Sequence, residues 1–352
     1  MEEGAKVQYK FIYWLRFVGV SLILYDHLGA LRNPDWFVAR GMEHFVNQPL
    51  GIIQYFGALG VSLFFIISGF CFVPKDSGGG HFFLRRIIKI EGALISTTIL
   101  FFIFNAIISA CVSPTYWDQY SIIDWFEGGT LICFILGKES VINGAVWYLF
   151  PLIAFEVLIA IFYPVIKKNQ LYLIAGIDSI YVLLLLWVKI TGNYIVQMQW
   201  LVFVLFPLFG ILLRGLLEKR LSFTKFLGII LVHWLICVEC IAAFRAEYYS
   251  AQPYLISLVY AVLIFGICMI CEQYFVLPPM VKFIADISFS IYLLHMTFGG
   301  MMMSYMEKLG VFSIGFVLTI CIVVILAIIH YKWIEKGVLD RLCKSINKSK
   351  HD

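Results

Sequence analysis

Residues 51–73 read GIIQYFGALGVSLFFIISGFCFV and contain no Asp, Glu, Lys or Arg. A helix rises about 1.5 Å per residue, so roughly 20 apolar residues cross the hydrocarbon core of a bilayer, which is about 30 Å thick. This stretch is therefore expected to form a membrane-spanning helix. Nine other stretches have a similar character, and the ten expected spans are residues 11–31, 51–73, 88–112, 145–166, 171–189, 199–217, 226–244, 253–274, 280–300 and 311–331.

The composition of the whole chain favours the same interpretation. Of its 352 residues, 62% are apolar and only 14% are charged, and the mean hydropathy is +0.91. A soluble domain of this length could not cover so much apolar surface with so few charges. We therefore expect an all-α, polytopic membrane helix bundle with about ten transmembrane helices. It should form one domain over residues 1–352, with a basic cytoplasmic tail over about 332–352.

Basic residues are distributed unevenly around these spans. The first span carries Arg16, Asp26 and His27 and has no small-residue cleavage site, so we expect it to remain in place instead of acting as a signal peptide. With both termini in the cytoplasm, most of the 26 Lys and Arg residues lie on the inner side. This asymmetry predicts the orientation and a multi-pass location in the cell membrane. The six basic residues on the outer side are Arg32, Arg40, Lys138, Lys189, Arg245 and Lys308.

Cysteine spacing does not indicate a metal centre. Two C-x-x-C pairs occur, Cys237 with Cys240 and Cys268 with Cys271. The expected topology places the pairs in opposite halves of the membrane, too far apart for four sulfurs to bind one zinc ion. We expect packed membrane thiols, no metal site and no nucleic-acid partner.

The longest stretch between spans, residues 113–144, lies outside in this topology and is rich in aromatic residues, among them Tyr116, Trp117 and Trp125. Two interpretations are open. The rings could form an aromatic belt at the membrane interface, or they could belong to a lid that stacks on a sugar.

Placing an ionisable side chain near the membrane centre costs at least about 2.5 kcal/mol of insertion free energy. Each such residue within a span is therefore expected to have a bonding partner or a functional role. Arg16 and His27 are about three helical turns apart and share one face of the first span, whereas Asp26 points about 100° away from His27. His295 falls at a depth comparable to that of His27. A hydrogen bond within the bundle remains the alternative to chemistry for each of them. Five more such residues have no partner that the sequence identifies: Glu91, Glu156, Asp178, His233 and Glu239.

Six short motifs follow one another along nearly the whole chain. They are Leu15-Arg16 followed by His27 after ten intervening residues, GVSLFFIISGF at 60–70, FFLRRIIK at 82–89, WYL at 147–149, ISFSIYLLH at 287–295 and YKWIEK at 331–336. In order and spacing they resemble the integral membrane acyltransferases of family 3, which O-acylate bacterial surface glycans and related molecules. The chain departs from that pattern at Lys89, where the family has a second arginine, and at Leu152, where many members have a glutamate.

The resemblance implies a donor side on the cytoplasmic face. The co-substrate would be an acyl-CoA, usually acetyl-CoA, with no tightly bound cofactor. Arg85, Arg86 and Lys89 would pair with the phosphates of this donor, and the thioester would reach inward past Arg16 toward His27.

The resemblance also implies the roles of the remaining groups. His27 would act as the general base for an acceptor hydroxyl, since an imidazole buried in a low-dielectric bundle is expected to stay neutral. Arg16 would position the donor or catalytic groups. Trp147, His295 and Asp26 are candidates for the acceptor side, where a glycan or another hydroxyl-bearing molecule would bind.

Alternatives remain at this point. An acyl-histidine intermediate would use the same His27. A transporter of a polar solute or sugar would also need buried charges, although the two halves of the chain show no inverted repeat. A scaffold or sensor that has kept the fold without the chemistry is a third interpretation. The sequence does not indicate the acceptor, the acyl chain or the oligomeric state.

Overall fold

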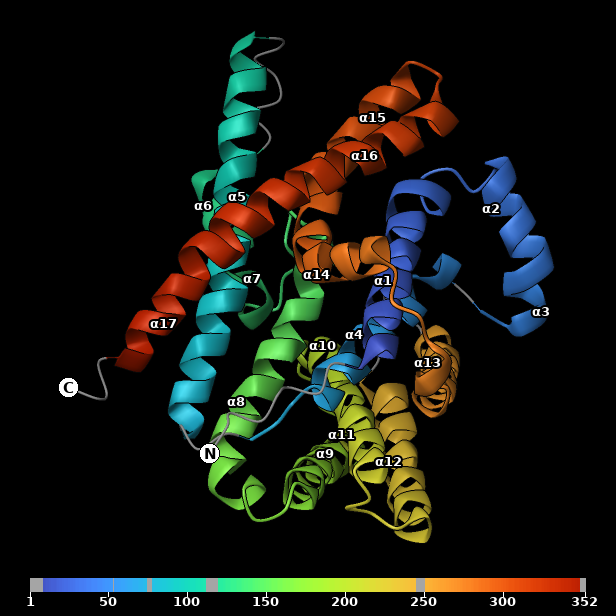
Figure 1. Ribbon diagram of the computed structural model, residues 1–352, viewed down its shortest axis with the longest axis vertical. Helices are drawn as coiled ribbons and strands as arrows, with labels where there is room; N and C mark the ends of the chain where they lie inside the picture. The colour runs from blue at the N-terminus through green and yellow to red at the C-terminus, as the bar shows by residue number, and fades with distance from the viewer. Residues whose placement is uncertain (1–8, 53, 75–77, 112–119, 245–250, 349–352) are drawn as a thin grey trace.

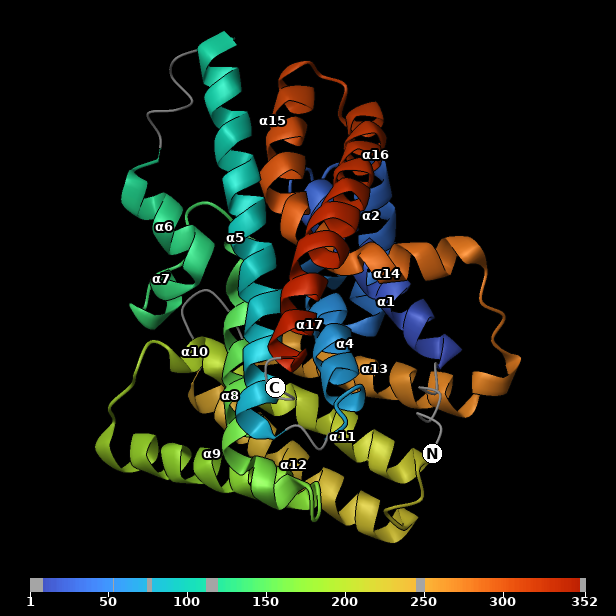
Figure 2. The same cartoon turned by 60° about the vertical axis from the view of Figure 1, so that its left-hand side comes forward.

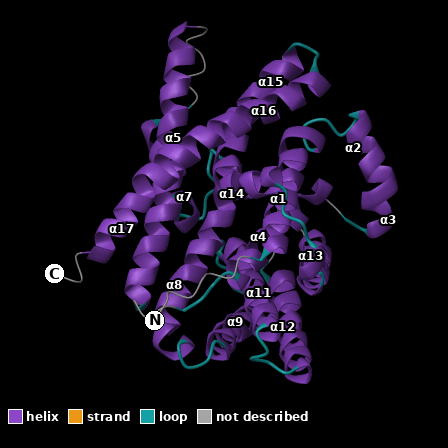
Figure 3. Cartoon of the chain, viewed as in Figure 1, coloured by secondary structure: helices purple, strands orange, loops and turns teal. Residues whose placement is uncertain are grey.

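The computed structural model describes residues 9–52, 54–74, 78–111, 120–244 and 251–348. Within these ranges the chain consists of helices joined by loops, with no strand (Figure 3). The α-helices are α1 (Lys10–Leu24), α2 (Phe37–Met42), α3 (Gln48–Leu50), α4 (Gly57–Phe70), α5 (Gly79–Cys111), α6 (Ile122–Thr130), α7 (Ile132–Ile135), α8 (Leu149–Ile166), α9 (Leu171–Thr191), α10 (Met198–Leu201), α11 (Phe206–Leu217), α12 (Phe223–Ala243), α13 (Ala251–Ile270), α14 (Pro279–Leu294), α15 (Gly300–Lys308), α16 (Phe312–His330) and α17 (Asp340–Lys348). The π-helical turns are η1 (Tyr25–Ala30), η2 (Glu43–Asn47), η8 (His295–Gly299) and η9 (Tyr331–Leu339), and the 3-10 turns are η3 (Gln54–Phe56), η5 (Gly144–Tyr148), η6 (Val202–Leu205) and η7 (Glu272–Tyr274).

Each expected span coincides with an apolar helix, and the prediction of an all-α, polytopic membrane protein is confirmed. Eight helices in the described residues are long and apolar enough to cross a membrane, and two further apolar helices, at 57–70 and 254–270, are shorter. The eight long helices are Lys10–Ala30, Gly79–Ile107, Gly144–Ile166, Leu171–Thr191, Met198–Leu217, Phe223–Ala243, Pro279–Lys308 and Phe312–Ile346.

Three of the apolar helices differ in length from expectation. The helix expected over 51–73 begins only at Gly57, because Gly51, Tyr55 and Phe56 have positive φ angles of 63°, 43° and 76° and turn the chain first. The last two long helices extend beyond 300 and 331, and they are separated at Gly310, which has a φ of 70°. Glycine tolerates this left-handed conformation, which ends a helix.

The helices cross one another at large angles. α5 and α8 follow the long axis of the molecule in both views, whereas α9 and α13 are seen nearly end-on in Figure 1 and run across the molecule in Figure 2. α4 lies among them and packs against α1, α11 and α13. This crossing brings segments from distant parts of the sequence together around α4.

Small residues allow α4 to approach its neighbours closely. A Cβ at Gly69 would lie 1.7 Å from the backbone oxygen of Pro207, and a Cβ at Gly210 would lie 2.0 Å from that of Ile66. A Cβ at Gly60 would lie 2.9 Å from a backbone oxygen of α1. Small residues at interfaces between membrane helices permit such backbone contact and the van der Waals packing that holds the helices together.

Most residues of the expected basic tail continue the last long helix, which ends at Ile346. α16 passes through η9 into α17, and this segment packs along α5. A Cβ at Gly92 would lie 2.6 Å from Leu339, and the Sγ of Cys343 donates to the backbone oxygen of Arg85 at 3.7 Å. Asp340 at the start of α17 also pairs with Lys89 of α5 at 2.7 Å. Residues 349–352 lie outside the described part of the chain.

The aromatic stretch between residues 113 and 144 is only partly described, since Tyr116 and Trp117 lie outside the described residues. Trp125 in α6 is buried, with its ring centroid 5.0 Å from that of Phe102 and 5.5 Å from that of Tyr120. The Trp125 ring therefore packs within the protein.

Candidate active site

His27 and His295 lie in contact. His27 belongs to η1, where the first long helix changes from α to π geometry, and His295 begins η8 directly after α14. Their rings are nearly parallel, at 8°, with centroids 5.1 Å apart, and Nδ1 of His27 is 2.8 Å from Nε2 of His295. π-helical turns are rare and occur frequently at functional sites. The π-helical turns η1 and η8 meet where His27 contacts His295.

The contacts of His295 determine where the protons lie when both rings are neutral. Nδ1 of His295 lies 2.5 Å from the backbone oxygen of Tyr292. A carbonyl oxygen only accepts hydrogen bonds, so this nitrogen carries the proton. Nε2 of His295 is then an acceptor, and Nδ1 of His27 donates to it. Nε2 of His27 is left with an available lone pair, which a general base requires.

Asp26 lies beside this nitrogen, contrary to the expectation from ideal α-helical geometry. In η1 the Oδ2 atom of Asp26 is 3.4 Å from Nε2 of His27. The carboxylate is buried against Gly57, where a Cβ would come within 1.9 Å of Oδ2. Oδ1 of Asp26 has no hydrogen-bond partner within the described residues. A carboxylate at this distance would attract the imidazolium that forms when His27 accepts a proton.

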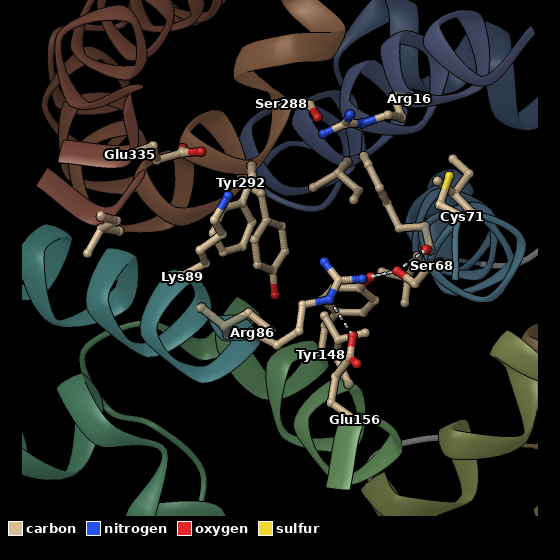
Figure 4. A pocket seen from close by; sticks show the side chains of 18 of the residues that line it. Arg16, Ser68, Cys71, Arg86, Lys89, Tyr148, Glu156, Ser288, Tyr292 and Glu335 are labelled. Carbon is tan, nitrogen blue, oxygen red and sulfur yellow. Dashed lines mark hydrogen bonds and ion pairs between the residues drawn. The ribbon is translucent and has the colours of Figure 1, made fainter. Parts of the chain in front are cut away.

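A cavity of about 350 Å³ lies between α1, α4, α5, α8, α14 and the η9–α17 segment (Figure 4). Its volume is within the range of small-molecule sites. Its lining combines apolar residues of α1 and α4 with charged residues from distant parts of the sequence. The charged residues are Arg16, Arg86, Lys89, Glu156, Glu335, Lys336 and Asp340.

Most cations of this cavity already have a carboxylate partner. Nε of Arg86 lies 3.0 Å from Oε1 of Glu156, which is 1% exposed. Nζ of Lys89 lies 2.7 Å from Oδ1 of Asp340, and Lys336 lies 3.5 Å from the other oxygen of the same carboxylate. A ligand phosphate would therefore share or displace these carboxylates.

Arg16 differs from these cations, because no carboxylate of the described residues lies within ion-pair distance of it. Figure 4 shows its guanidinium reaching into the cavity near Ser288. A guanidinium offers five N–H donors in a planar fork. Arg16 is therefore the cation most available to a bound anion or polar ligand.

Glu335 reaches the cavity from a buried hydrogen-bond network that connects three helices. Ser290 in α14 donates to the carboxylate of Glu335 and lies 2.7 Å from Nδ1 of His330 in α16. Nε2 of His330 lies 2.8 Å from Oγ of Ser96 in α5. The network fixes the position of a carboxylate at the cavity wall.

The cavity ends one helical turn before the histidine pair. Ile23 and Tyr292 line it, four residues before His27 and three before His295, while neither histidine lines it. Residues four apart on a helix share one face, so Ile23 is the cavity-lining residue one turn before His27 on the same face. Ile23 is 1% exposed, whereas the His27 side chain is 21% exposed.

The structure separates the expected site residues into two groups. Arg16, Arg86 and Lys89 line the cavity, and Asp26, His27 and His295 form the adjoining cluster. Arg85 and Trp147 do neither. The Trp147 ring is buried 5.0 Å from Phe203 and 6.2 Å from Tyr254, measured between centroids.

Other residues of the cavity were not assigned a role from sequence. Glu156 stood out only as an acid inside a span, because its pairing with Arg86 depends on how α8 packs against α5. Glu335 and Tyr148 lie within the motifs YKWIEK and WYL, whose presence could have indicated them.

These features define a multi-pass membrane helix bundle with a charged cavity one helical turn from a histidine pair, of which His295 is buried and His27 is partly exposed. Residues 9–332 match a family model described as an acyltransferase domain, which covers most of the chain. The chain therefore belongs to acyltransferase family 3 and is a membrane acyltransferase, which confirms the resemblance noted in its motifs. No curated protein and no solved structure matches it.

Proposed function

We propose that this acyltransferase moves an acyl group, acetyl in particular, from cytoplasmic acyl-CoA to a hydroxyl of a cell-surface glycan, with His27 as the general base. The observation that carries the proposal is the chain of contacts from the Tyr292 carbonyl through His295 to Nδ1 of His27. In the neutral pair this chain leaves the lone pair on Nε2 of His27. A hydroxyl is a poor nucleophile and needs such a base during attack on a thioester.

In the proposed step, Nε2 of His27 takes the proton of the acceptor hydroxyl while its oxygen attacks the thioester carbonyl. The new C–O bond forms, the C–S bond breaks, and the CoA thiolate receives the proton from the imidazolium. Asp26 and His295 hold the charged ring during this step, since Asp26 lies 3.4 Å from Nε2 and His295 accepts from Nδ1 at 2.8 Å. No oxidant or metal is needed for this balance.

The donor is proposed to enter at the charged part of the cavity. Arg86 and Lys89 would bind its phosphates while exchanging part of their contacts with Glu156 and Asp340. Arg16, which lies deeper along α1, would hold the polar arm that carries the thioester. Arg85 does not line the cavity and is therefore a natural control.

The acceptor is proposed to approach His27 from the side opposite the cavity, outside a plasma membrane. Oδ1 of Asp26 lacks a partner in the described residues and could accept a hydrogen bond from the glycan. His295 is 0% exposed and bonded through both nitrogens, so its role is to position His27. The buried packing of Trp147 supports a structural role near this side.

The direct test compares cell-envelope glycans from cells with and without the full chain by mass spectrometry. The proposal expects a mass increase of one acyl group only when the chain is present, and label from acyl-CoA in that ester. A chain that changes the flux of a solute and esterifies nothing would overturn the proposal.

The donor route is tested with two neighbouring arginines. Arg86→Ala should raise the KM for acyl-CoA about tenfold, the loss expected for one charge-assisted contact of ~1.4 kcal/mol, while the KM for the acceptor stays unchanged. Arg85→Ala should leave both values near those of the unaltered protein. Equal donor dependence in the two variants would remove Arg86 from the donor site.

A further inference from the structure

A second cavity, of about 690 Å³, lies beyond the C-terminal end of α4. It is formed by the segment after α4, the turn between α8 and α9, and the turn between α11 and α12, which lie at the lower end of the molecule in Figure 1. Cys71 lines the first cavity, whereas Val73 and Pro74 line the second. The two cavities are therefore neighbours separated by the short segment that follows α4.

The second cavity has an excess of positive charge. Its walls carry four basic side chains and one carboxylate, that of Glu218. The first cavity, by comparison, has four basic side chains and three carboxylates. The basic residues of the second cavity are Lys167, Lys168, Arg214 and Arg220.

The two arginines of this cavity are held in fixed positions. Arg214 contacts Oε1 of Glu218 at 2.7 Å and donates to the backbone oxygen of Phe70 at 2.9 Å. Arg220 contacts Oε2 of Glu218 at 2.5 Å and donates to Oε1 of Gln170 at 2.7 Å. Guanidinium groups fixed in this way lose little conformational freedom when they bind an anion.

Glu218 does not cancel this charge. Partial burial acts against its ionisation, but the hydrogen bonds and charges of Arg214 and Arg220 hold the pKa of the carboxyl below its usual value. Glu218 is therefore ionised at neutral pH and balances one of the two arginines. Lys168 is exposed and adds further positive charge.

We propose that this second cavity binds a phosphate group. The shared chemistry is that of a phosphomonoester or phosphodiester, which guanidinium and ammonium groups recognise through charge-assisted hydrogen bonds. Two sources have this chemistry: the headgroup of an anionic phospholipid, which basic pockets between membrane helices attract, and the phosphates of a soluble nucleotide. The inference does not depend on the proposed acyl donor, because it rests on the geometry and charge of the second cavity alone.

The test uses the full chain in nanodiscs and two variants within the cavity. Lys168→Gln removes one exposed charge without altering a buried contact, and Arg220→Gln keeps hydrogen-bonding capacity without the charge. Lys225→Gln is the matched control, since Lys225 is an exposed lysine on α12 that lines neither cavity. Where Arg220→Gln lowers the yield of folded protein, Lys168→Gln decides the outcome.

The probes are inorganic phosphate, CoA, dephospho-CoA, and phosphatidylglycerol mixed into phosphatidylcholine discs. Binding is followed by native mass spectrometry and by the shift in melting temperature. The proposal expects at least one phosphate probe to bind saturably to the unaltered protein and to the Lys225→Gln control, with affinity about fivefold lower in both cavity variants.

The choice of probes distinguishes a lipid headgroup from a soluble nucleotide as the source of the phosphate. Retention of phosphatidylglycerol that is lost in the cavity variants identifies a lipid headgroup, whereas a preference for CoA over dephospho-CoA that is lost in them identifies a soluble nucleotide. Equal binding of every probe to the cavity variants and to Lys225→Gln would overturn the inference. That outcome would leave the proposed acyl transfer untouched, because glycan acylation is measured separately.

Discussion

His233 and His27 both place an imidazole within a long membrane helix, but their rings are bonded differently. Nδ1 of His233 lies 2.8 Å from Oδ1 of Asp178 in α9, and its Nε2 lies 3.0 Å from the backbone oxygen of Leu205. The ring is 0% exposed. Among the described residues His27 has a hydrogen-bond partner at Nδ1 alone, and its side chain is 21% exposed.

The difference separates a structural histidine from a chemically competent one. Both nitrogens of His233 face oxygen atoms, so the ring cross-links α9, α12 and η6 and has no site left for a substrate proton. His27 keeps one nitrogen available, beside the unpartnered Oδ1 of Asp26 and one turn from a cavity. A histidine within a membrane helix is expected to have a specific role. The bonding of its two nitrogens indicates whether that role is to cross-link helices or to exchange a proton.

The largest expected effect comes from removing the competent ring. His27→Ala should lower kcat for acyl transfer by about 10²–10⁴-fold, the usual contribution of a general base, with little change in melting temperature in detergent. Initial rates with labelled acyl-CoA measure this. The exposed His44 provides a control, since His44→Ala should retain full activity. Full activity in His27→Ala would remove His27 from the mechanism.

Removing the structural ring should instead affect stability. His233→Leu leaves the carboxylate of Asp178 and the Leu205 oxygen without a partner, which costs about 1–3 kcal/mol. Thermal unfolding of the purified protein should shift downward, while kcat per folded molecule stays the same. Combining His233→Leu with Asp178→Leu should recover part of the loss, because the unpaired charge is removed as well. A His233→Leu variant with a lower kcat and an unchanged melting temperature would contradict a structural role for His233.

A smaller effect is expected at the partner of His27. His295→Leu removes the acceptor for Nδ1 of His27 and should lower kcat about tenfold, or ~1.4 kcal/mol, the value of one buried hydrogen bond. His295→Gln offers a carbonyl oxygen in place of Nε2 and should recover part of the rate. Equal rates in the two variants would show that His295 acts through packing alone.

The smallest effect concerns Ile23, the cavity-lining residue one turn before His27. Ile23→Ala should shift the donor preference from acetyl toward butyryl by about fivefold in kcat/KM, because removing methyl groups enlarges the end of the cavity nearest His27. Ile90 lines the same cavity beside Lys89, so Ile90→Ala should leave the preference unchanged. The same shift in both variants would mean that the acyl group does not reach Ile23.

The helices of this fold could be predicted from sequence because hydropathy is a local property. Every expected span contains an apolar helix, since roughly 20 apolar residues leave the chain few alternatives in a membrane. The ends were less predictable. The helix expected from 51 begins at Gly57, and the one expected to end at 331 continues to 346 through contacts with α5 that no local pattern encodes.

The site could be predicted in part. The rarity of charge in spans indicated Arg16 and His27, and it placed His295 at the depth of His27, where the structure has the two rings in contact. The pairing of Arg86 with Glu156, 70 residues apart in sequence, required knowledge of helix packing. The approach of Asp26 to His27 could not be derived either, because an assumption of 100° per residue fails in a π turn.

The π turns also set a rotational register. η1 forms the C-terminal end of the first long helix, so the helical register between Arg16 and η1 fixes the angle between Arg16, which lines the cavity, and His27. Deleting one residue between them would rotate one half of that helix against the other by about 100°. Changes in chain length should therefore be tolerated in the surface loops but not between residues 16 and 27.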